Sequence, residues 1–267
     1  MSQPTINNQP LFYSAAEPLD KTRHASLGLK RAEGGQFKFA AQAYAVPLNA
    51  PEFNHALKSY PIIFTSLTDP KAVAALGIQR DRNLFVNDDG TWLEGAYIPA
   101  YVRRYPFIFA EMSEQDQYAL CVDRNSELVS ETPDFPFFEN GEMSEATRRA
   151  MEFCQLFQQQ AVISEPILKE LGASGLLTEK DLTIKRPDGS DQRIGGYIAV
   201  DEQRLATMSD EAFLDLRRKD ILPYIYMHLS SLSNWTRLLD LHVRRQGTTG
   251  APTPTDAPEG GETPTVS

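Results

Sequence analysis

Residues 144–161 read SEATRRAMEFCQLFQQQA, and this stretch decides the fold class because the hydrophobic pattern of the chain changes here. The hydroxyl of Ser144 can cap a helix, and Glu145 in the first turn is favourable against the helix dipole. Apolar residues then recur at spacings of three and four, which places them on one helix face. These residues are Ala146, Ala150, Phe153, Cys154, Phe157 and Ala161. The pattern predicts a helix that Pro166 should kink or restart, because proline lacks the amide donor.

On the N-terminal side, from about residue 36 to about residue 138, short apolar runs alternate with turn residues, which is typical of strands. Asn87-Asp88-Asp89-Gly90 ends in Asp-Gly, a strong signal for a tight turn between two paired runs. Pro61 lies near the start of the run at residues 60–65, where a strand tolerates the missing backbone N–H donor of proline. The strands predicted from this pattern are residues 37–40, 43–46, 60–65, 83–86, 91–93, 105–110 and 118–123.

On the C-terminal side the pattern predicts one more hairpin and two further helices. The hairpin joins residues 182–184 to residues 193–200 through the turn Pro187-Asp188-Gly189. Ser209 caps a short helix, and a last helix begins near Pro223. The apolar stripe of that last helix is Ile225, Leu229, Leu232, Trp235 and Leu239. The whole predicts an α+β fold: a strand-rich N-terminal half with a mixed or antiparallel sheet, and a helical C-terminal half with an additional hairpin.

The ends of the chain differ in composition from its middle. Residues 1–17 are polar and contain proline, and we expect a flexible N-terminal arm. Residues 247–267 hold 4 Pro, 4 Gly and 6 Thr in 21 residues, so they cannot bury enough apolar area to offset the entropy of ordering. We therefore expect a single globular domain over residues 18–246 and a disordered tail over residues 247–267.

The charge balance excludes one large class of partner. The 267 residues hold 26 Lys and Arg against 36 Asp and Glu, a net charge of −10. Such a chain has no general attraction for phosphate backbones, so no nucleic-acid partner is expected.

Two further features bear on location. No run approaches the ~18 consecutive apolar residues of a membrane span, and no secretory signal is visible at residues 1–8. Both cysteines, Cys121 and Cys154, have apolar neighbours and are interpreted as buried, reduced core thiols; a disulfide or a reactive nucleophile is the alternative. The expected location is the cytoplasm, with export by a dedicated machine as the alternative.

The densest candidate site is the aromatic-arginine segment, residues 97–107, which reads YIPAYVRRYPF and follows Trp92. A guanidinium group can bind a carboxylate or phosphate through two hydrogen bonds and can stack on an aromatic ring. If the segment is a strand, adjacent side chains point to opposite faces, and at most one arginine can point into a given site. Two interpretations remain: Arg103 and Arg104 pair with buried or surface carboxylates and hold the fold, or they bind an anionic ligand or a partner peptide. The candidate binding residues are Trp92, Tyr97, Tyr101, Arg103, Arg104 and His228.

The histidines offer no metal-binding spacing, because no HxH, HxxxH or HxD pair occurs among His24, His55, His228 and His242. His228 precedes Leu229 of the apolar stripe and is interpreted as a hydrogen-bonded histidine at the edge of the core; a general base is the alternative. Phosphate-cradling loops and the GxSxG nucleophile turn are absent. No metal or cofactor is therefore expected.

The same motifs resemble the bacterial SapC family. The resemblance runs from about residue 18 to about residue 242 and is most specific in the aromatic-arginine segment. It is also carried by Tyr60-Pro61-Ile62-Ile63-Phe64, Gly77, Asn83-Leu84-Phe85-Val86, Gly90-Thr91-Trp92, Cys121-Val122-Asp123, Phe138 with Gly141, Gly196-Tyr197, and Tyr226 with His228-Leu229-Ser230-Ser231-Leu232. The family name implies an association with surface-layer proteins, but the resemblance implies no catalytic residue, cofactor or substrate.

We therefore expect a soluble bacterial binding protein without enzymatic activity. Its aromatic-arginine segment would bind an anionic small molecule, a peptide or another protein such as a surface-layer subunit; the oligomeric state stays open. The alternative is an enzyme or accessory subunit whose site is assembled from dispersed residues such as Tyr101, Arg103 and His228, which requires these three side chains to share a pocket.

Overall fold

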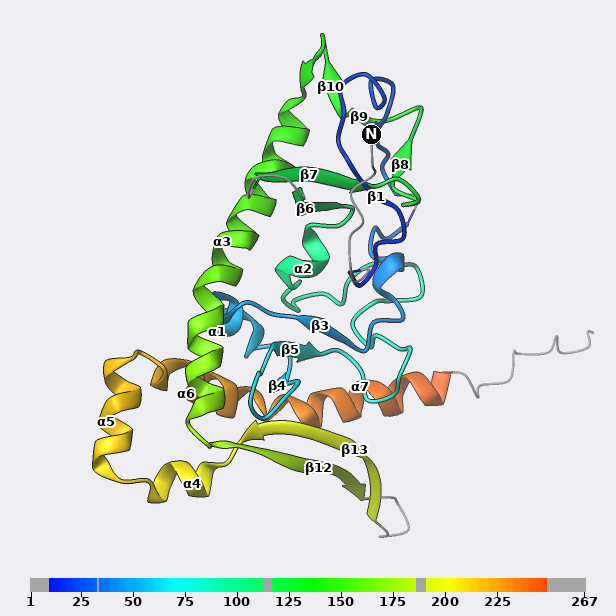
Figure 1. Ribbon diagram of the computed structural model, residues 1–267. Coiled ribbons are helices and arrows are strands. Elements are labelled where there is room, and N and C mark those ends of the chain that lie inside the picture. The colour runs from blue at the N-terminus through cyan, green and yellow to red at the C-terminus, as the bar shows by residue number, and fades with distance from the viewer. Residues whose placement is uncertain (1–9, 33, 113–116, 186–190, 249–267) are drawn as a thin grey trace, which may run out of the picture.

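The computed structural model describes residues 10–32, 34–112, 117–185 and 191–248. It has the α+β fold predicted from the sequence, with antiparallel sheets in the N-terminal half and helices in the C-terminal half. The long helix α3 (Glu145–Ala173) runs along one side of the molecule and connects an upper group of strands to a lower sheet (Figure 1). The described part of the chain contains no helix with the length and apolar character needed to cross a membrane.

The upper part is built from small antiparallel sheets. Its main sheet has the strand order β1-β7-β6, and smaller sheets with the orders β8-β2-β9 and β10-β11 lie beside it. The bounds are β1 (Ala16–Pro18), β2 (Gly28–Leu29), β6 (Phe107–Met112), β7 (Gln117–Asp123), β8 (Val129–Ser130), β9 (Phe135–Pro136), β10 (Phe138–Glu139) and β11 (Glu142–Met143). The strands predicted at 105–110 and 118–123 are thus confirmed as β6 and β7.

The lower part is a five-stranded antiparallel sheet with the order β12-β13-β4-β5-β3. Its strands are β3 (Ala45–Pro47), β4 (Ile62–Phe64), β5 (Ala72–Ala75), β12 (Leu177–Lys185) and β13 (Asp191–Val200). The hairpin β12–β13 joins the sheet where Ile198 of β13 faces Phe64 of β4. This is the additional hairpin predicted from the sequence; its turn at 187–189 lies outside the described residues.

Helices and short helical turns complete the fold. Helix α6 packs against β4, β13 and α1. The helices besides α3 are α1 (Phe53–Ala56), α2 (Ala100–Arg103), α4 (Glu202–Thr207), α5 (Asp210–Arg218), α6 (Leu222–Ser231) and α7 (Asn234–Thr248), and the 3-10 turns are η1 (Lys38–Ala40) and η2 (Ala50–Glu52). Ser209 caps α5 by accepting a hydrogen bond from the backbone of Ala212, as predicted.

The two largest hydrophobic cores formed by the described residues lie in the lower and the upper part of the molecule. The lower core is the larger one and includes Tyr60, Phe53 and Phe85, which are fully buried. The upper core surrounds Phe107 and Phe137. Helix α3 contributes Cys154 to the upper core and Leu168 and Leu171 to the lower core, so it ties the two together.

The cysteines are buried and free, as the sequence indicated. Cys121 and Cys154 form no disulfide. Desolvation raises the pKa of each thiol to about 11, so both stay protonated at neutral pH. Neither thiol has the low pKa of a reactive nucleophile.

Helix α3 begins where the sequence predicted but does not restart at Pro166. Ser144 accepts a hydrogen bond from the backbone of Thr147 and caps the first turn. The helix continues through Pro166 to Ala173. Pro166 and Val162, whose carbonyl loses its amide partner, are both exposed, so water can replace the missing bond without cost to a packed interface.

Three local predictions were wrong. Residues 37–40 form the 3-10 turn η1 rather than a strand, and residues 83–93 form a turn with a single bridge between Val86 and Trp92 rather than a hairpin. The turn itself is confirmed, with Gly90 at φ +84°. The last helix is split into α6 and α7, and at the break the side-chain amide of Asn234 donates to the carbonyl of Ser231 at the end of α6 as well as to those of Leu57 and Tyr60.

The segment expected to be a flexible arm is packed over its described part, residues 10–17. Tyr13 is buried and donates a hydrogen bond of 2.6 Å to the carbonyl of Phe107. The carboxylate of Asp123 on β7 accepts hydrogen bonds from the backbones of Ser14 and Ala15. The aromatic ring of Tyr13 and these polar contacts offset the entropy of ordering, although the segment is polar in composition.

Candidate anion-binding site

The aromatic-arginine segment forms a helical turn, α2, followed by the strand β6, and not one continuous strand. A buried carboxylate fixes the start of the turn: Glu52, 3% exposed, accepts a hydrogen bond of 2.7 Å from the backbone of Ala100. The same carboxylate accepts hydrogen bonds from the hydroxyl of Tyr97 and the backbone of Asn49. Glu52 thus holds α2 against η2 through hydrogen bonds, which explains how it stays buried.

Arg104 is buried at the end of this turn, with 9% of its surface exposed. Its guanidinium lies between two rings, 4.2 Å from the centroid of Tyr101 and 4.3 Å from that of Phe157. Cation–π contacts of this kind are worth roughly 2 kcal/mol when desolvated. Among the residues that the structure describes, Nε of Arg104 has no hydrogen-bond partner and no carboxylate forms a salt bridge with the side chain.

Arg103 is exposed and held by different groups. Its Nε donates a hydrogen bond of 3.0 Å to the carbonyl of Ile98, and Nη2 donates to the hydroxyl of Tyr97 at 3.2 Å. The guanidinium lies 4.9 Å from the centroid of Phe153 on α3. It too forms no salt bridge within the described ranges. Among the described residues, the two arginines thus contact rings, a backbone carbonyl and a hydroxyl, and form no salt bridge with the buried or surface carboxylates expected as their partners.

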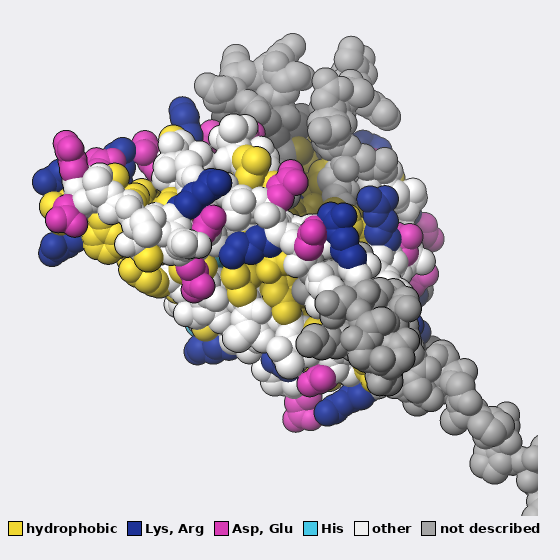
Figure 2. Space-filling view, turned by 90° about the horizontal axis from the view of Figure 1, so that it is seen from below, with side chains coloured by type: hydrophobic (Ala, Val, Ile, Leu, Met, Phe, Trp, Pro, Cys, Tyr) yellow, Lys and Arg dark blue, Asp and Glu magenta, His cyan; other side chains and the backbone are white. Residues whose placement is uncertain are grey.

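Both arginines line one cavity of about 700 Å³, a size typical of ligand sites. The expectation that at most one of them could face a site was wrong, because successive residues of a helical turn are about 100° apart rather than opposite. Five cationic side chains line this cavity and no carboxylate does, counting the described residues. The cationic side chains are Lys30, Arg31, Arg103, Arg104 and Arg149. On the face seen from below, by contrast, positive and negative side chains are interspersed (Figure 2).

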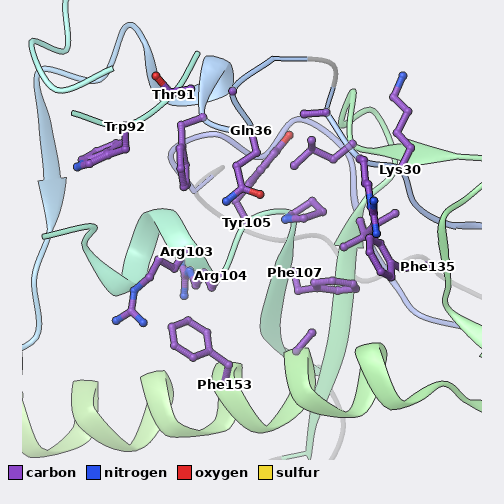
Figure 3. Close-up of a pocket in the computed structure, with 18 of the residues that line it drawn as sticks. Lys30, Gln36, Thr91, Trp92, Arg103, Arg104, Tyr105, Phe107, Phe135 and Phe153 are labelled. Atoms are coloured by element: carbon purple, nitrogen blue, oxygen red, sulfur yellow. The ribbon is translucent and has the colours of Figure 1, made fainter. Parts of the chain in front are cut away.

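Aromatic rings supply much of the remaining wall. Figure 3 shows Arg103 and Arg104 near Phe153 on one side of the cavity, and Lys30 and Phe135 on the other, with Tyr105 and Phe107 between them. The ring of Tyr105 stacks on Phe39 at 4.1 Å between centroids. Its hydroxyl donates to Asp123, the residue that also anchors the N-terminal segment.

A close contact between two glycines positions one wall of the cavity. The backbone of Gly35 donates a hydrogen bond of 2.7 Å to the carbonyl of Asp89, in the turn that leads to Trp92. A Cβ at Gly35 would lie 1.7 Å from the carbonyl carbon of Gly90, so only glycine allows this approach. The turn that the sequence predicted at 87–90 therefore packs against Gly35 and holds this part of the cavity wall in place.

The six candidate binding residues from the sequence differ in where they lie: three line the cavity, two lie behind its wall, and His228 lies elsewhere. Trp92, Arg103 and Arg104 line the cavity. Trp92, 8% exposed, donates its indole N–H to the hydroxyl of Tyr60, so this donor is already used inside the fold. Tyr97 and Tyr101 lie behind the wall: each contacts one arginine, and the hydroxyl of Tyr101 donates to the carbonyl of Leu11.

His228 lies elsewhere, fully buried in the lower core. Its Nε2 accepts a hydrogen bond from the backbone of Val200, so its Nδ1 carries the proton and donates to the carbonyl of Ile62. Desolvation lowers its pKa to about 4. The imidazole has no free position for substrate and does not line the arginine cavity, so a pocket shared by Tyr101, Arg103 and His228 is not present in the described structure.

The sequence analysis missed several lining residues, namely Lys30, Arg31, Tyr105, Phe135, Arg149 and Phe153. Lys30-Arg31 is another adjacent basic pair, separated by two residues from the glycines at 34 and 35, and this pattern was the available signal. Within the described ranges, no group of three or more His, Cys, Asp or Glu side chains is arranged to hold a metal ion.

Comparison with known proteins gives one match. The family model SapC matches residues 19–238, which is most of the chain and includes α2 and all of the strands except β1. No curated protein and no solved structure matches the chain. The chain belongs to the SapC family.

Proposed function

We propose that this protein is a binding protein for a small organic anion, and that the ligand occupies the cavity lined by Arg103 and Arg104. The observation that carries the proposal is Arg104: a buried guanidinium that lines the cavity and lacks a carboxylate among the described residues. A buried charge without a counterion is unfavourable, and a bound anion would supply the missing partner.

The chemistry of the wall favours an anion with an apolar body. The guanidinium groups can donate paired hydrogen bonds to a carboxylate or phosphate. Phe37, Phe107 and Phe153 provide apolar surface beside them. We propose binding rather than catalysis as the role of this site, because these side chains supply charge and apolar contact to a ligand.

Decanoate, a carboxylate with an apolar chain, is a suitable probe. We expect isothermal titration calorimetry to show saturable binding of decanoate and much weaker binding of neutral decanol. Arg103→Gln should weaken decanoate binding by about tenfold, because a hydrogen bond to a charged group is worth roughly 1.5–3 kcal/mol.

Arg237→Gln is the matched control. Arg237 is half-buried rather than exposed, but like Arg103 it donates to a backbone carbonyl and lies over an aromatic ring, that of Phe85, and it does not line the cavity. Equal affinities for decanoate in the wild type and in Arg103→Gln would contradict the proposal, as would the absence of saturable binding.

We propose the cytoplasm as the compartment, and the two free, buried cysteines, Cys121 and Cys154, agree with a reducing environment. Export to the cell surface, which a surface-layer role would require, is the competing location. Fractionation of native cells distinguishes the two.

A further inference from the structure

The cationic side chains of the cavity lie in two groups that come from distant parts of the sequence. Arg103 and Arg104 belong to α2 and its C-cap. Lys30 and Arg31 directly follow β2, and Lys30 lies on the opposite side of the cavity from Arg103 in Figure 3. The fifth cation, Arg149, already forms a salt bridge of 3.0 Å with Glu145, so it is less available to a ligand.

The second group is as unpaired as the first. Lys30 and Arg31 form no salt bridge in the part of the chain that the structure describes. The guanidinium of Arg31 lies 5.6 Å from the centroid of Phe135, and the backbone of Arg31 donates to Asp134. This stacking leaves the edge of the guanidinium, which carries its hydrogen-bond donors, available to an anion.

The space between the two groups has a different character. Phe107 and Tyr105 lie there in Figure 3, and the ring of Tyr105 is stacked on Phe39. The wall thus presents apolar surface between two cationic ends. The ends also differ in burial: Arg104 is buried, whereas Lys30 and Arg31 are exposed.

We propose that the ligand carries two anionic groups joined by an apolar segment, with one group bound by Arg103 and Arg104 and the other by Lys30 and Arg31. This inference rests on the proposed function, because it assigns one anionic group of the ligand to each end of the same cavity. A single-headed anion would leave the second cationic pair without a partner. A neutral apolar molecule would leave both pairs without one.

A neighbouring cavity of about 550 Å³ supports the position of the second head group. It shares Lys30, Arg31 and Tyr105 with the arginine cavity and also includes Lys38 and Glu127. Lys30 and Arg31 therefore stand where the two cavities meet. A head group bound there stays close to water, which reduces the desolvation that a second negative charge would otherwise require.

The test compares decanedioate with decanoate by calorimetry. Both ligands have the same chain length and differ in one carboxylate. The wild-type protein should bind decanedioate about tenfold more tightly, since two exposed ion pairs contribute only modestly. A series of dicarboxylates should show an affinity maximum at one chain length, because the two cationic pairs are a fixed distance apart.

The double variant Lys30→Gln/Arg31→Gln separates the two ends. It should bind decanedioate and decanoate with equal affinity, and its affinity for decanoate should equal that of the wild type. The control is Arg217→Gln/Arg218→Gln, an exposed adjacent basic pair on α5 outside the cavity, which changes the net charge by the same amount. This control should keep the preference for decanedioate.

The outcomes distinguish this inference from the proposed function. If the wild type binds decanoate and decanedioate with equal affinity, the proposal of a ligand with two anionic groups is wrong, but the proposed anion-binding site is still supported. If the preference for decanedioate persists in Lys30→Gln/Arg31→Gln, the second cationic pair has been assigned wrongly. If neither ligand binds, both proposals are overturned.

Discussion

At the scale of single residues, the buried side chains of Glu52 and Arg104 have different kinds of surroundings. Glu52 is buried and accepts hydrogen bonds from Asn49, Tyr97 and Ala100, so its charge is compensated inside the fold. Arg104 is buried with two rings and an Nε that has no partner among the described residues. The first arrangement is structural, and the second leaves capacity to bind an anion. Sequence analysis could locate Arg104 among aromatic residues but could not reveal its burial or its missing carboxylate.

His228 gives the first prediction, which concerns stability against pH. Burial holds its pKa at about 4 in the folded state, against 6.5 for an ordinary histidine. Between about pH 6.5 and about pH 4 the unfolded chain therefore binds a proton that the folded protein does not, and the free energy of unfolding falls as the pH falls. The loss should reach about 3 kcal/mol near pH 4. Urea unfolding at several pH values measures it.

Two observations would check the assignment to His228. A His228→Gln variant should lose this part of the pH dependence, although it will be less stable at every pH because it loses its hydrogen bonds to Ile62 and Val200. In the intact protein, the imidazole resonances of His228 should stay in the neutral form at pH 5. A midpoint near 6.5 in the NMR titration would show that the ring is not buried as described.

At the scale of elements, the spacing of apolar residues predicted several elements and failed where tertiary contacts decide the local structure. The spacing of apolar residues placed α3, β6 and β7 correctly, because each buries one continuous face. Residues 37–40 alternate like a strand, but they form η1, whose position is set by tertiary hydrogen bonds such as that from the side chain of Asn83 to Ala40. The division between α6 and α7 likewise lies next to Asn234, whose side chain contacts residues about 175 positions away.

Pro166 gives the second prediction, at the level of helix α3. Proline in a helix interior removes one backbone hydrogen bond and disfavours the helix by roughly 3 kcal/mol relative to alanine. Because Pro166 is exposed, Pro166→Ala should remove few packing contacts and restore the bond from residue 166 to the carbonyl of Val162. We expect the free energy of unfolding to rise by about 1–3 kcal/mol in urea titrations.

Glu165→Ala serves as the control for this change, since it alters the adjacent exposed position without restoring a backbone bond. Its effect should stay within about 0.5 kcal/mol. A stability of Pro166→Ala at or below that of the wild type would mean that the helix has fully accommodated the proline and that no bond is missing.

At the scale of the whole molecule, the arginine cavity lies where the two hydrophobic cores meet. Its lining includes Trp92 and Phe37, which pack in or against the lower core, and Phe107 and Leu29, which pack in or against the upper core. The lining residues are far apart in the sequence, so no local pattern could have assembled them. The sequence supplied the aromatic-arginine segment, while residues 30–32 and 34–37 and the start of α3 reach the site only through the fold.

This position leads to the last prediction: a ligand in the cavity should affect both cores at once. The chain has two tryptophans, and Trp235→Phe leaves Trp92 as the only one. Decanedioate should displace water beside the Trp92 ring and move its emission to shorter wavelength along the calorimetric saturation curve. At a ligand concentration of about 100 times Kd, the free energy of unfolding should rise by about 2.7 kcal/mol.

The upper core should report the same event through Cys154, which is buried there and follows Phe153 of the cavity wall. Its thiol reacts only when the surrounding structure opens, so bound ligand should slow its labelling by a thiol reagent, as followed by peptide mass spectrometry. A shift in Trp92 emission without slower labelling of Cys154 would contradict binding in this cavity. Slower labelling with unchanged Trp92 emission would place the ligand away from Trp92. Only a change in both reporters, with the same dependence on ligand concentration, agrees with a site that joins the two cores.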